Sequence, residues 1–429
     1  MTKDTFKGLV VILDGLGDRP CAKLGNKTPL EHANTPVLDS IVEHNQSGMM
    51  NPLLPGLPVD THTGVSIIFG LPPMIAAGLK RGPIEASGID LDLEPGDLLF
   101  RANLATIESI DNKNFRILDR RAQRIKKGVD ALCSSLQDIS LQGDICASLH
   151  PATHHRCVLR LRGPGLSDRI TDTDPGGKEI HRGVLLAGAD LEQDPCSQRT
   201  ASALNEFTQI SHRILNNHPV NIKRLKDGLL AANGILTRGV GQYQEYLNIL
   251  RYLRLNVTVV AGEATILGLA KLFNFNTVTD PSFTSSTDTN IEKKLSDAVT
   301  ALKTSDLVFV HLKGTDTAAH DRNPQAKSDF IGRFDQALGE IDIDNIILGI
   351  CADHSTDSNR GEHNGDAVPI LIHNPMGRKD LAHRFNETDC SAGAFVNLTA
   401  QGFITSVLDA MGSLSNYKPS EIDFFELNR

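Results

Sequence analysis

The chain has 429 residues, of which 40% are hydrophobic and 22% are charged. This length favours two domains, and the composition is that of an ordinary globular protein. The formal net charge of -9 argues against broad electrostatic attraction to nucleic acid or to an anionic membrane.

The N-terminus and the cysteines predict a cytoplasmic protein. The apolar run from Leu9 to Leu13 is too short for a signal peptide and ends in Asp14. No stretch approaches the length of a membrane span. The seven cysteines are scattered and form no CxxC pair, which indicates reduced thiols. We therefore expect no membrane partner and no nucleic-acid partner, whereas the sequence gives no signal for an oligomeric state.

Continuous apolar segments predict the strands of a mostly parallel sheet. Residues 7–13 read as a strand buried on both faces, because their apolar side chains are continuous rather than alternating. Three later segments have the same pattern: 306–312, 345–351 and 367–372. Strands at 257–260 and 277–278 flank a helical stretch near 266–272, which is typical of a βαβ unit.

The middle of the chain has a different pattern. From about Leu98 to Arg162, short runs with polar alternation indicate strands near 98–103, 115–118 and 157–161. Helical patterns cover 125–136 and 200–215. The predicted fold class is therefore α/β, with a mostly parallel sheet core, helices on both faces and an inserted smaller α+β domain. We place the core at 1–75 and 240–429, and the insertion at 76–239.

Six potential metal ligands lie in four short segments of the predicted core. They are Asp14, Asp316, His320, Asp353, His354 and His363. Ligands of open α/β sheets bind beyond the carboxyl ends of the strands, and three of these segments follow strands directly. Asp316 and His320 are four residues apart and would share one face of a helical turn. Asp353 and His354 would converge only in a loop, because adjacent residues of a strand point to opposite faces.

Each of these six residues, taken alone, also fits a helix cap, a turn or a solvated loop. Together they predict a site for two divalent cations, with Mn²⁺ favoured and Zn²⁺, Co²⁺ or Mg²⁺ possible. The absence of cysteine from the set argues against a closed structural zinc site. A two-metal site of this kind suits phosphoryl or sulfuryl transfer.

A hydroxyl nucleophile is predicted in the segment Pro58–Ser66. We favour Thr61, because a hydroxyl near a cation loses its proton more readily and can attack phosphorus. Thr63 and Ser66 are alternatives. The segment also fits a simple loop that caps a helix starting near Thr63.

Several motifs connect the chain to a known family. They include Ile12-Leu13-Asp14-Gly15-Leu16-Gly17-Asp18-Arg19-Pro20, Phe100-Arg101-Ala102-Asn103, Asp119-Arg120-Arg121-Ala122-Gln123-Arg124 and His311-Leu312-Lys313-Gly314-Thr315-Asp316. In these motifs and their order, the chain resembles the archaeal-type 2,3-bisphosphoglycerate-independent phosphoglycerate mutases of the alkaline phosphatase superfamily. The resemblance implies an alkaline-phosphatase-like core. It also implies one metal held by Asp14, the nucleophile, Asp353 and His354, and a second held by Asp316, His320 and His363.

The resemblance further implies that the insertion binds a small phosphorylated carboxylic acid through basic residues. We expect Arg124, Arg156 and Arg238 to contact this substrate, since arginine binds carboxylate and phosphate bidentately. Lys313 would neutralise the transferring phosphoryl group, and His62 would act as a proton shuttle or as a neighbouring hydrogen-bond donor.

The chain departs from the family pattern at the nucleophile. Family members usually have a serine followed by an acidic residue, whereas this chain aligns Thr61 and His62 there. The expected activity is the interconversion of 3- and 2-phosphoglycerate through a phosphothreonine intermediate. One alternative is a two-metal phosphohydrolase, or a mutase-like enzyme for another phosphorylated or phosphonate carboxylic acid. Another is a catalytically silent metal-binding protein.

Overall fold

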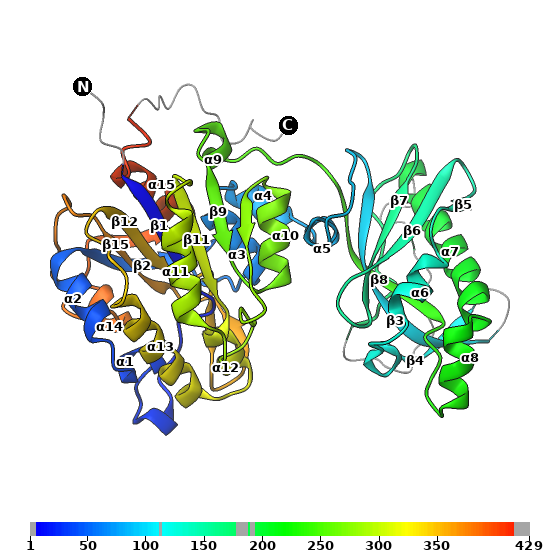
Figure 1. Ribbon diagram of the computed structural model, residues 1–429, viewed down its shortest axis with the longest axis horizontal. Helices are drawn as coiled ribbons and strands as arrows, with labels where there is room; N and C mark the ends of the chain where they lie inside the picture. The colour runs from blue at the N-terminus through cyan, green and yellow to red at the C-terminus, as the bar shows by residue number, and fades with distance from the viewer. Residues whose placement is uncertain (1–5, 111–113, 177–187, 189–193, 416–429) are drawn as a thin grey trace. The chain divides into compact units, whose positions relative to one another are not determined.

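The computed structural model of the protein describes residues 6–110, 114–176, 188 and 194–415. The chain divides into two compact units (Figure 1). Unit 1 comprises Met1–Leu79 and Tyr246–Arg429, and unit 2 comprises Lys80–Glu245. The sequence-based boundaries lie at 75/76 and 239/240.

Unit 1 is built on an eight-stranded sheet with the order β10-β9-β11-β1-β12-β15-β2-β16. The strands are β1 (Lys7–Leu13), β2 (Gln46–Asn51), β9 (Val257–Val260), β10 (Asn276–Val278), β11 (Leu307–Leu312), β12 (Ile346–Cys351), β15 (Val368–His373) and β16 (Phe395–Thr399). The five strands from β10 to β12 are parallel, and β10 follows β9 through a helix as the βαβ pattern predicts. In contrast, β15 is antiparallel to both of its neighbours. Our grouping of 367–372 with the parallel strands is therefore wrong, because a continuous apolar run reports burial on both faces but not strand direction.

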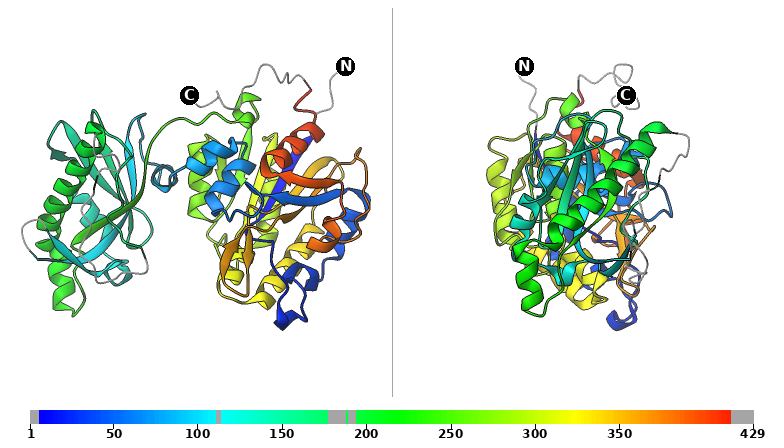
Figure 2. Two further views of the ribbon diagram at one scale, coloured as in Figure 1. Left: turned by 180° about the vertical axis from the view of Figure 1, so that it is seen from behind. Right: turned by 90° about the vertical axis from the view of Figure 1, so that its right-hand side faces the viewer.

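Helices cover both faces of this sheet. Figures 1 and 2 show α11 and α13 on one face and α3 and α15 on the other. The helices of unit 1 are η1 (Ala22–Leu24), α1 (Pro29–His32), α2 (Pro36–His44), α3 (Thr61–Ile68), α4 (Pro73–Gly78), α9 (Ile249–Tyr252), α10 (Ala264–Leu272), α11 (Ile291–Ala301), α12 (Gly314–His320), α13 (Pro324–Leu338), α14 (Glu387–Cys390) and α15 (Ala400–Ala410). A separate ribbon pairs β13 (Ser355–Asp357) with β14 (Glu362–Asn364).

Unit 2 is an antiparallel sheet covered by helices. Its strands run in the order β4-β3-β7-β6-β5, and β8 also pairs with β3. The elements are α5 (Arg81–Gly88), β3 (Leu98–Ser109), β4 (Phe115–Asp119), η2 (Ala122–Arg124), α6 (Val129–Ser134), β5 (Ile139–Leu141), β6 (Ile145–Pro151), β7 (Arg156–Arg162), α7 (Pro195–Asn216), α8 (Pro219–Lys226) and β8 (Gly234–Gln242). The helix expected at 125–136 is thus shorter than predicted.

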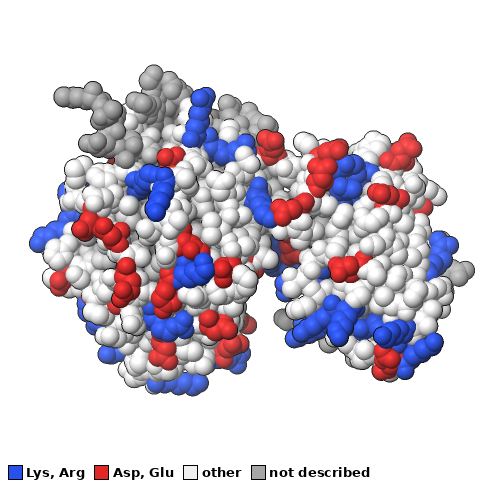
Figure 3. Space-filling view, viewed as in Figure 1, with Lys and Arg blue, Asp and Glu red and all other residues white. Residues whose placement is uncertain are grey.

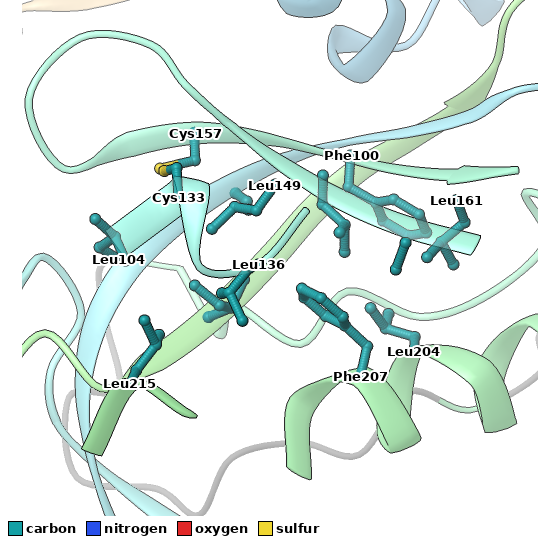
Figure 4. Packing of buried hydrophobic residues seen from close by; sticks show 14 of the residues in the cluster. Phe100, Leu104, Cys133, Leu136, Leu149, Cys157, Leu161, Leu204, Phe207 and Leu215 are labelled. Atoms are coloured by element: carbon teal, nitrogen blue, oxygen red, sulfur yellow. The ribbon is translucent and has the colours of Figure 1, made fainter. Parts of the chain in front are cut away.

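The core of unit 2 lies between one face of this sheet and α7. Phe207 and Leu204 of α7 point toward Phe100 and Leu161 of the strands (Figure 4), and all four are buried. Burial of a side chain of this size stabilises a fold by about 1.5–3 kcal/mol. The predicted α/β core with an α+β insertion is confirmed. Among the residues that the structure describes, no helix combines the length and the apolarity needed to cross a bilayer.

Candidate functional site

The predicted ligands of unit 1, except His363, follow the carboxyl ends of three adjacent strands. β1 is parallel to β11 and β12, with Leu13 opposite Leu312 and Ile12 opposite Cys351. Figure 1 shows β11, β1 and β12 side by side. Asp14 therefore follows β1 at the same edge at which β12 leads into Asp353 and His354. β11 leads into α12, where Asp316 and His320 are one helical turn apart as predicted.

One group of ligand atoms is fully buried. His354 Nε2 lies 3.1 Å from Asp14 Oδ1 and 3.4 Å from Asp353 Oδ2. These two carboxylate oxygens are buried and have no hydrogen-bond partner among the described residues. A buried carboxylate oxygen without a partner is costly unless a cation binds it. Asp14, Asp353 and His354 thus fit a divalent cation by donor type and by position.

A second group of ligand atoms surrounds Asp316. Its Oδ1 lies 3.3 Å from His320 Nε2 and 3.5 Å from His363 Nε2, and the two imidazole nitrogens are 3.2 Å apart. His354 also lies within this group, and its ring stacks on that of His363 at 3.7 Å between centroids. His363 belongs to the short strand β14 rather than to the loop that we expected. Its Nδ1 contacts the carbonyl of Val59 at 2.8 Å, so Nε2 faces the other ligands.

The hydroxyl of Thr61 lies beside these ligand atoms. Thr61 begins α3, and its Oγ1 is 3.1 Å from His354 Nε2. α3 packs closely against the backbone of Asp353. A Cβ added to Gly64 would lie only 2.2 Å from the carbonyl oxygen of Asp353, so no side chain fits at this position. Of the two alternatives, Ser66 is fully buried and donates its hydroxyl hydrogen bond to the carbonyl of His62. Thr63 lines a cavity of about 620 Å³ that is also lined by His320 and His363.

Lys313 contacts two of the three carboxylates of the site. Its Nζ lies 2.8 Å from Asp14 Oδ2, 2.8 Å from Asp316 Oδ2 and 3.4 Å from Thr61 Oγ1. Burial alone lowers the pKa of this lysine, but the carboxylates of Asp14 and Asp316 raise it well above its ordinary value. Lys313 is therefore a fixed positive charge next to the Thr61 hydroxyl. His62 is buried in α3, and its role stays a prediction.

His311 is a residue of this site that our sequence reasoning missed. It lies in β11 and is 1% exposed, with Nε2 3.0 Å from Asp14 Oδ2. Within an apolar strand this histidine looks like an ordinary core residue. Only the pairing of β11 with β1, in which Ile12 is opposite His311, brings it next to Asp14.

Unit 2 contains a basic pocket of about 510 Å³. Arg124, Arg156 and Arg238, which we predicted as substrate contacts, all line it. Lys and Arg side chains gather at the end of this unit where β3 and β4 lie (Figure 3). The remaining lining residues are Arg101, Asn103, Arg120, Arg121, Lys126, Thr153, His154 and His155.

Strand register brings the basic side chains of this pocket together. Arg238 of β8 is opposite Arg101 of β3, and Arg156 of β7 is opposite Asn103. Two of the cations are already paired: Arg101 with Glu85 at 3.2 Å and Arg120 with Asp174 at 2.6 Å. Arg238 Nε, like Arg101 Nε, is buried without a hydrogen-bond partner among the described residues. This nitrogen is suited to an anionic ligand.

Arg124 lies in a strained turn. Ala122, Gln123 and Arg124 have positive φ values of 43°, 55° and 53°. A residue other than glycine in this region costs about 1–3 kcal/mol, and such strain is common at binding sites. Burial and then the neighbouring Arg156 and Arg121 lower the pKa of His155 in the same pocket to about 4, so its ring is neutral at pH 7.

Comparisons with known proteins identify the family of this chain. A family model described as 2,3-bisphosphoglycerate-independent phosphoglycerate mutase matches residues 43–221. A mutase of that name from Methanosphaera stadtmanae is 35% identical over 95% of this chain and 98% of its own length. One from Thermococcus kodakarensis is 36% identical over 94% of this chain and 97% of its own length.

Solved structures show the same relationship. A protein from Pyrococcus horikoshii has 31% identity and a TM-score of 0.79, covering 95% of this chain and 98% of its own. The cofactor-independent phosphoglycerate mutase from Thermoplasma acidophilum has 29% identity and a TM-score of 0.71, covering 95% of this chain and 100% of its own. The predicted family is thus confirmed. The chain belongs to the family of 2,3-bisphosphoglycerate-independent phosphoglycerate mutases, which are isomerases.

Proposed function

We propose that this protein interconverts 3- and 2-phosphoglycerate through a phosphothreonine intermediate on Thr61, in a site for two divalent metal ions. The observation that carries the proposal is the position of Thr61 Oγ1, 3.1 Å from His354 Nε2 and 3.4 Å from Lys313 Nζ. A hydroxyl at that position borders both groups of candidate ligands.

Asp14, Asp353 and His354, together with Thr61, would hold one ion, and Asp316, His320 and His363 would hold the other. Mixed carboxylate and imidazole donors suit Mn²⁺, Zn²⁺ or Co²⁺ better than Mg²⁺. When bound, such ions lower the pKa of a hydroxyl and neutralise phosphate charge.

Each group of residues would then have its own role in the reaction. Thr61 would give up its hydroxyl proton to solvent when an ion binds, and its Oγ1 then attacks phosphorus while the bond between phosphorus and the substrate oxygen breaks on the opposite side. That substrate oxygen takes up a proton, and the other hydroxyl of the acid loses one when the phosphoryl group is transferred to it. Lys313 is held protonated by two carboxylates, so it stabilises the charge of the transferring group and does not take the proton of Thr61. The basic pocket of unit 2, with Arg124, Arg156 and Arg238, binds the anionic acid so that it is not lost between the two transfers.

Replacement of the nucleophile tests this proposal. Thr61→Ala should lower the formation of 2-phosphoglycerate from 3-phosphoglycerate by about 10³-fold or more, because no phosphoryl acceptor remains. The assay contains Mn²⁺ but no 2,3-bisphosphoglycerate, and the metal content of the variant should stay that of the wild type.

Thr63→Ala is the matched control, since it removes the neighbouring hydroxyl of the same helix. Full activity of Thr61→Ala, with loss in Thr63→Ala, would transfer the nucleophile role to Thr63. Release of inorganic phosphate by the wild type without formation of 2-phosphoglycerate would instead identify a phosphohydrolase.

A further inference from the structure

The hydroxyl of Thr356 lies between the two groups of ligands. Thr356 is fully buried in β13, two residues after His354. Its Oγ1 is 3.1 Å from His354 Nδ1 and 2.8 Å from Asp316 Oδ1. It therefore contacts one ligand of each group. On His354 it contacts Nδ1, the ring nitrogen other than Nε2, and on Asp316 it contacts Oδ1, the oxygen that also lies near His320 and His363.

The two hydrogen bonds of the Thr356 hydroxyl indicate which ring nitrogen of His354 has a proton. An ionised carboxylate can only accept, so the single hydroxyl proton of Thr356 is donated to Asp316 Oδ1. The Thr356 oxygen is then left to accept from His354, which requires a proton on Nδ1. A neutral His354 with this proton has its lone pair on Nε2, the nitrogen that lies 3.1 Å from both Asp14 Oδ1 and Thr61 Oγ1.

The backbone of Thr356 is held firmly in place. Its N–H donates to the carbonyl of Gly17 at 2.9 Å, and its carbonyl accepts from Lys327 Nζ at 3.1 Å. Lys327 is fully buried and also donates to Asp18 Oδ2 at 2.8 Å. Removing one partner of a buried ion pair is strongly destabilising, so this pair keeps the segment after β12 in one position.

The absence of a side chain at Gly15 leaves space for the hydroxyl of Thr356. A Cβ added to Gly15 would lie 2.5 Å from Thr356 Oγ1 and 2.9 Å from Asp316 Oδ1, and the φ of Gly15 is +65°. A side chain at position 15 would therefore displace the hydroxyl as well as strain the backbone.

We propose that Thr356 is a positioning residue that keeps His354 in its Nδ1–H form and links it to Asp316, so that the Thr356 hydroxyl strengthens metal binding by both ligand groups. This inference rests on the proposed two-metal function. Groups that orient metal ligands in this way typically change metal affinity by about 10- to 100-fold when they are removed.

The test compares the binding of Mn²⁺ to the metal-free full-length protein by titration calorimetry. Thr356→Val keeps the shape of the side chain but lacks the hydroxyl, and it should bind Mn²⁺ about 10- to 100-fold more weakly. Thr356→Ser keeps the hydroxyl and should bind like the wild type. Thr258→Val is the matched control, because it removes a buried threonine hydroxyl of unit 1 that contacts Ser305 instead of a ligand.

Wild-type affinity in Thr356→Val would overturn the inference while leaving the two-metal proposal standing, whereas a wild-type protein that binds no Mn²⁺ would overturn the proposed function itself. A second measurement needs no variant. Nitrogen-15 NMR of the histidine-labelled, zinc-loaded wild type should show a proton on Nδ1 of His354, and a proton on Nε2 would contradict the role of Thr356.

Discussion

Single residues set the charge balance of the candidate site. Asp14 and Asp316 are buried carboxylates that share the ammonium group of Lys313, which lies 2.8 Å from each. The sequence predicted Lys313 as a cation near the phosphoryl group, but it could not show that one ammonium spans two ligands. It also gave no sign of His311 or Thr356, because each looks like an ordinary strand or loop residue until the fold places it beside a ligand.

Glu387 gives a prediction about pH and stability. It accepts hydrogen bonds from the Thr28 hydroxyl at 2.8 Å and the Asp18 N–H at 3.3 Å, and burial raises its pKa to about 7. An unfolded glutamate titrates near pH ~4.3. Between these values the folded protein retains a proton that the unfolded chain loses, so this group lowers stability as pH rises, by at most about 1.4 kcal/mol per pH unit.

Glu387→Gln cannot titrate, so it should become more stable relative to the wild type as pH rises from 5 to 8. Urea unfolding of both proteins at several pH values measures this difference. A difference in unfolding free energy that stays constant across the range would mean that Glu387 ionises normally in the fold.

At the scale of elements, strands and helices were predictable where one local pattern decides them. The apolar runs of β1, β11 and β12 indicate buried strands, and the four-residue spacing of Asp316 and His320 indicates a helical turn. The direction of β15 was not predictable, since hydrophobic pattern carries no information on strand direction. The contact of Arg101 with Arg238 depends on the register between β3 and β8, which lie far apart in the sequence.

The strained turn η2 gives a prediction about substrate binding. Arg224 of α8 donates from Nη2 to the carbonyl of Ala122 at 3.0 Å and from Nε to the carbonyl of Leu230 at 2.9 Å. Arg224→Met removes these bonds, each worth about 1.5–3 kcal/mol when the donor is charged. The left-handed turn should relax, and KM for 3-phosphoglycerate should rise about tenfold or more with a smaller change in kcat.

Lys223→Met is the control for this variant, because Lys223 is an exposed residue of the same helix. Steady-state kinetics of the two variants separate the effects. Equal KM values in Arg224→Met and the wild type would show that η2 keeps its conformation without Arg224.

At the scale of the whole molecule, the two units contain different kinds of candidate site. Unit 1 holds the candidate metal ligands at the carboxyl edge of its sheet, and unit 2 holds the basic pocket at the strands β3, β7 and β8. The sequence predicted this division because the pattern of apolar residues changes at the insertion. The composition of the basic pocket was only partly predictable, since Asn103 and Arg101 enter it through cross-strand pairs.

Anomalous diffraction at the manganese edge, from crystals of the full-length protein grown with Mn²⁺, would locate the metal ions directly. The proposed two-metal site predicts two peaks, one within bonding distance of Asp14, Asp353 and His354, and one within bonding distance of Asp316, His320 and His363. Oxygen and nitrogen ligands of such ions lie at about 2.0–2.2 Å. Well-ordered crystals without a peak at either group, or with Mn²⁺ bound only elsewhere, would contradict it.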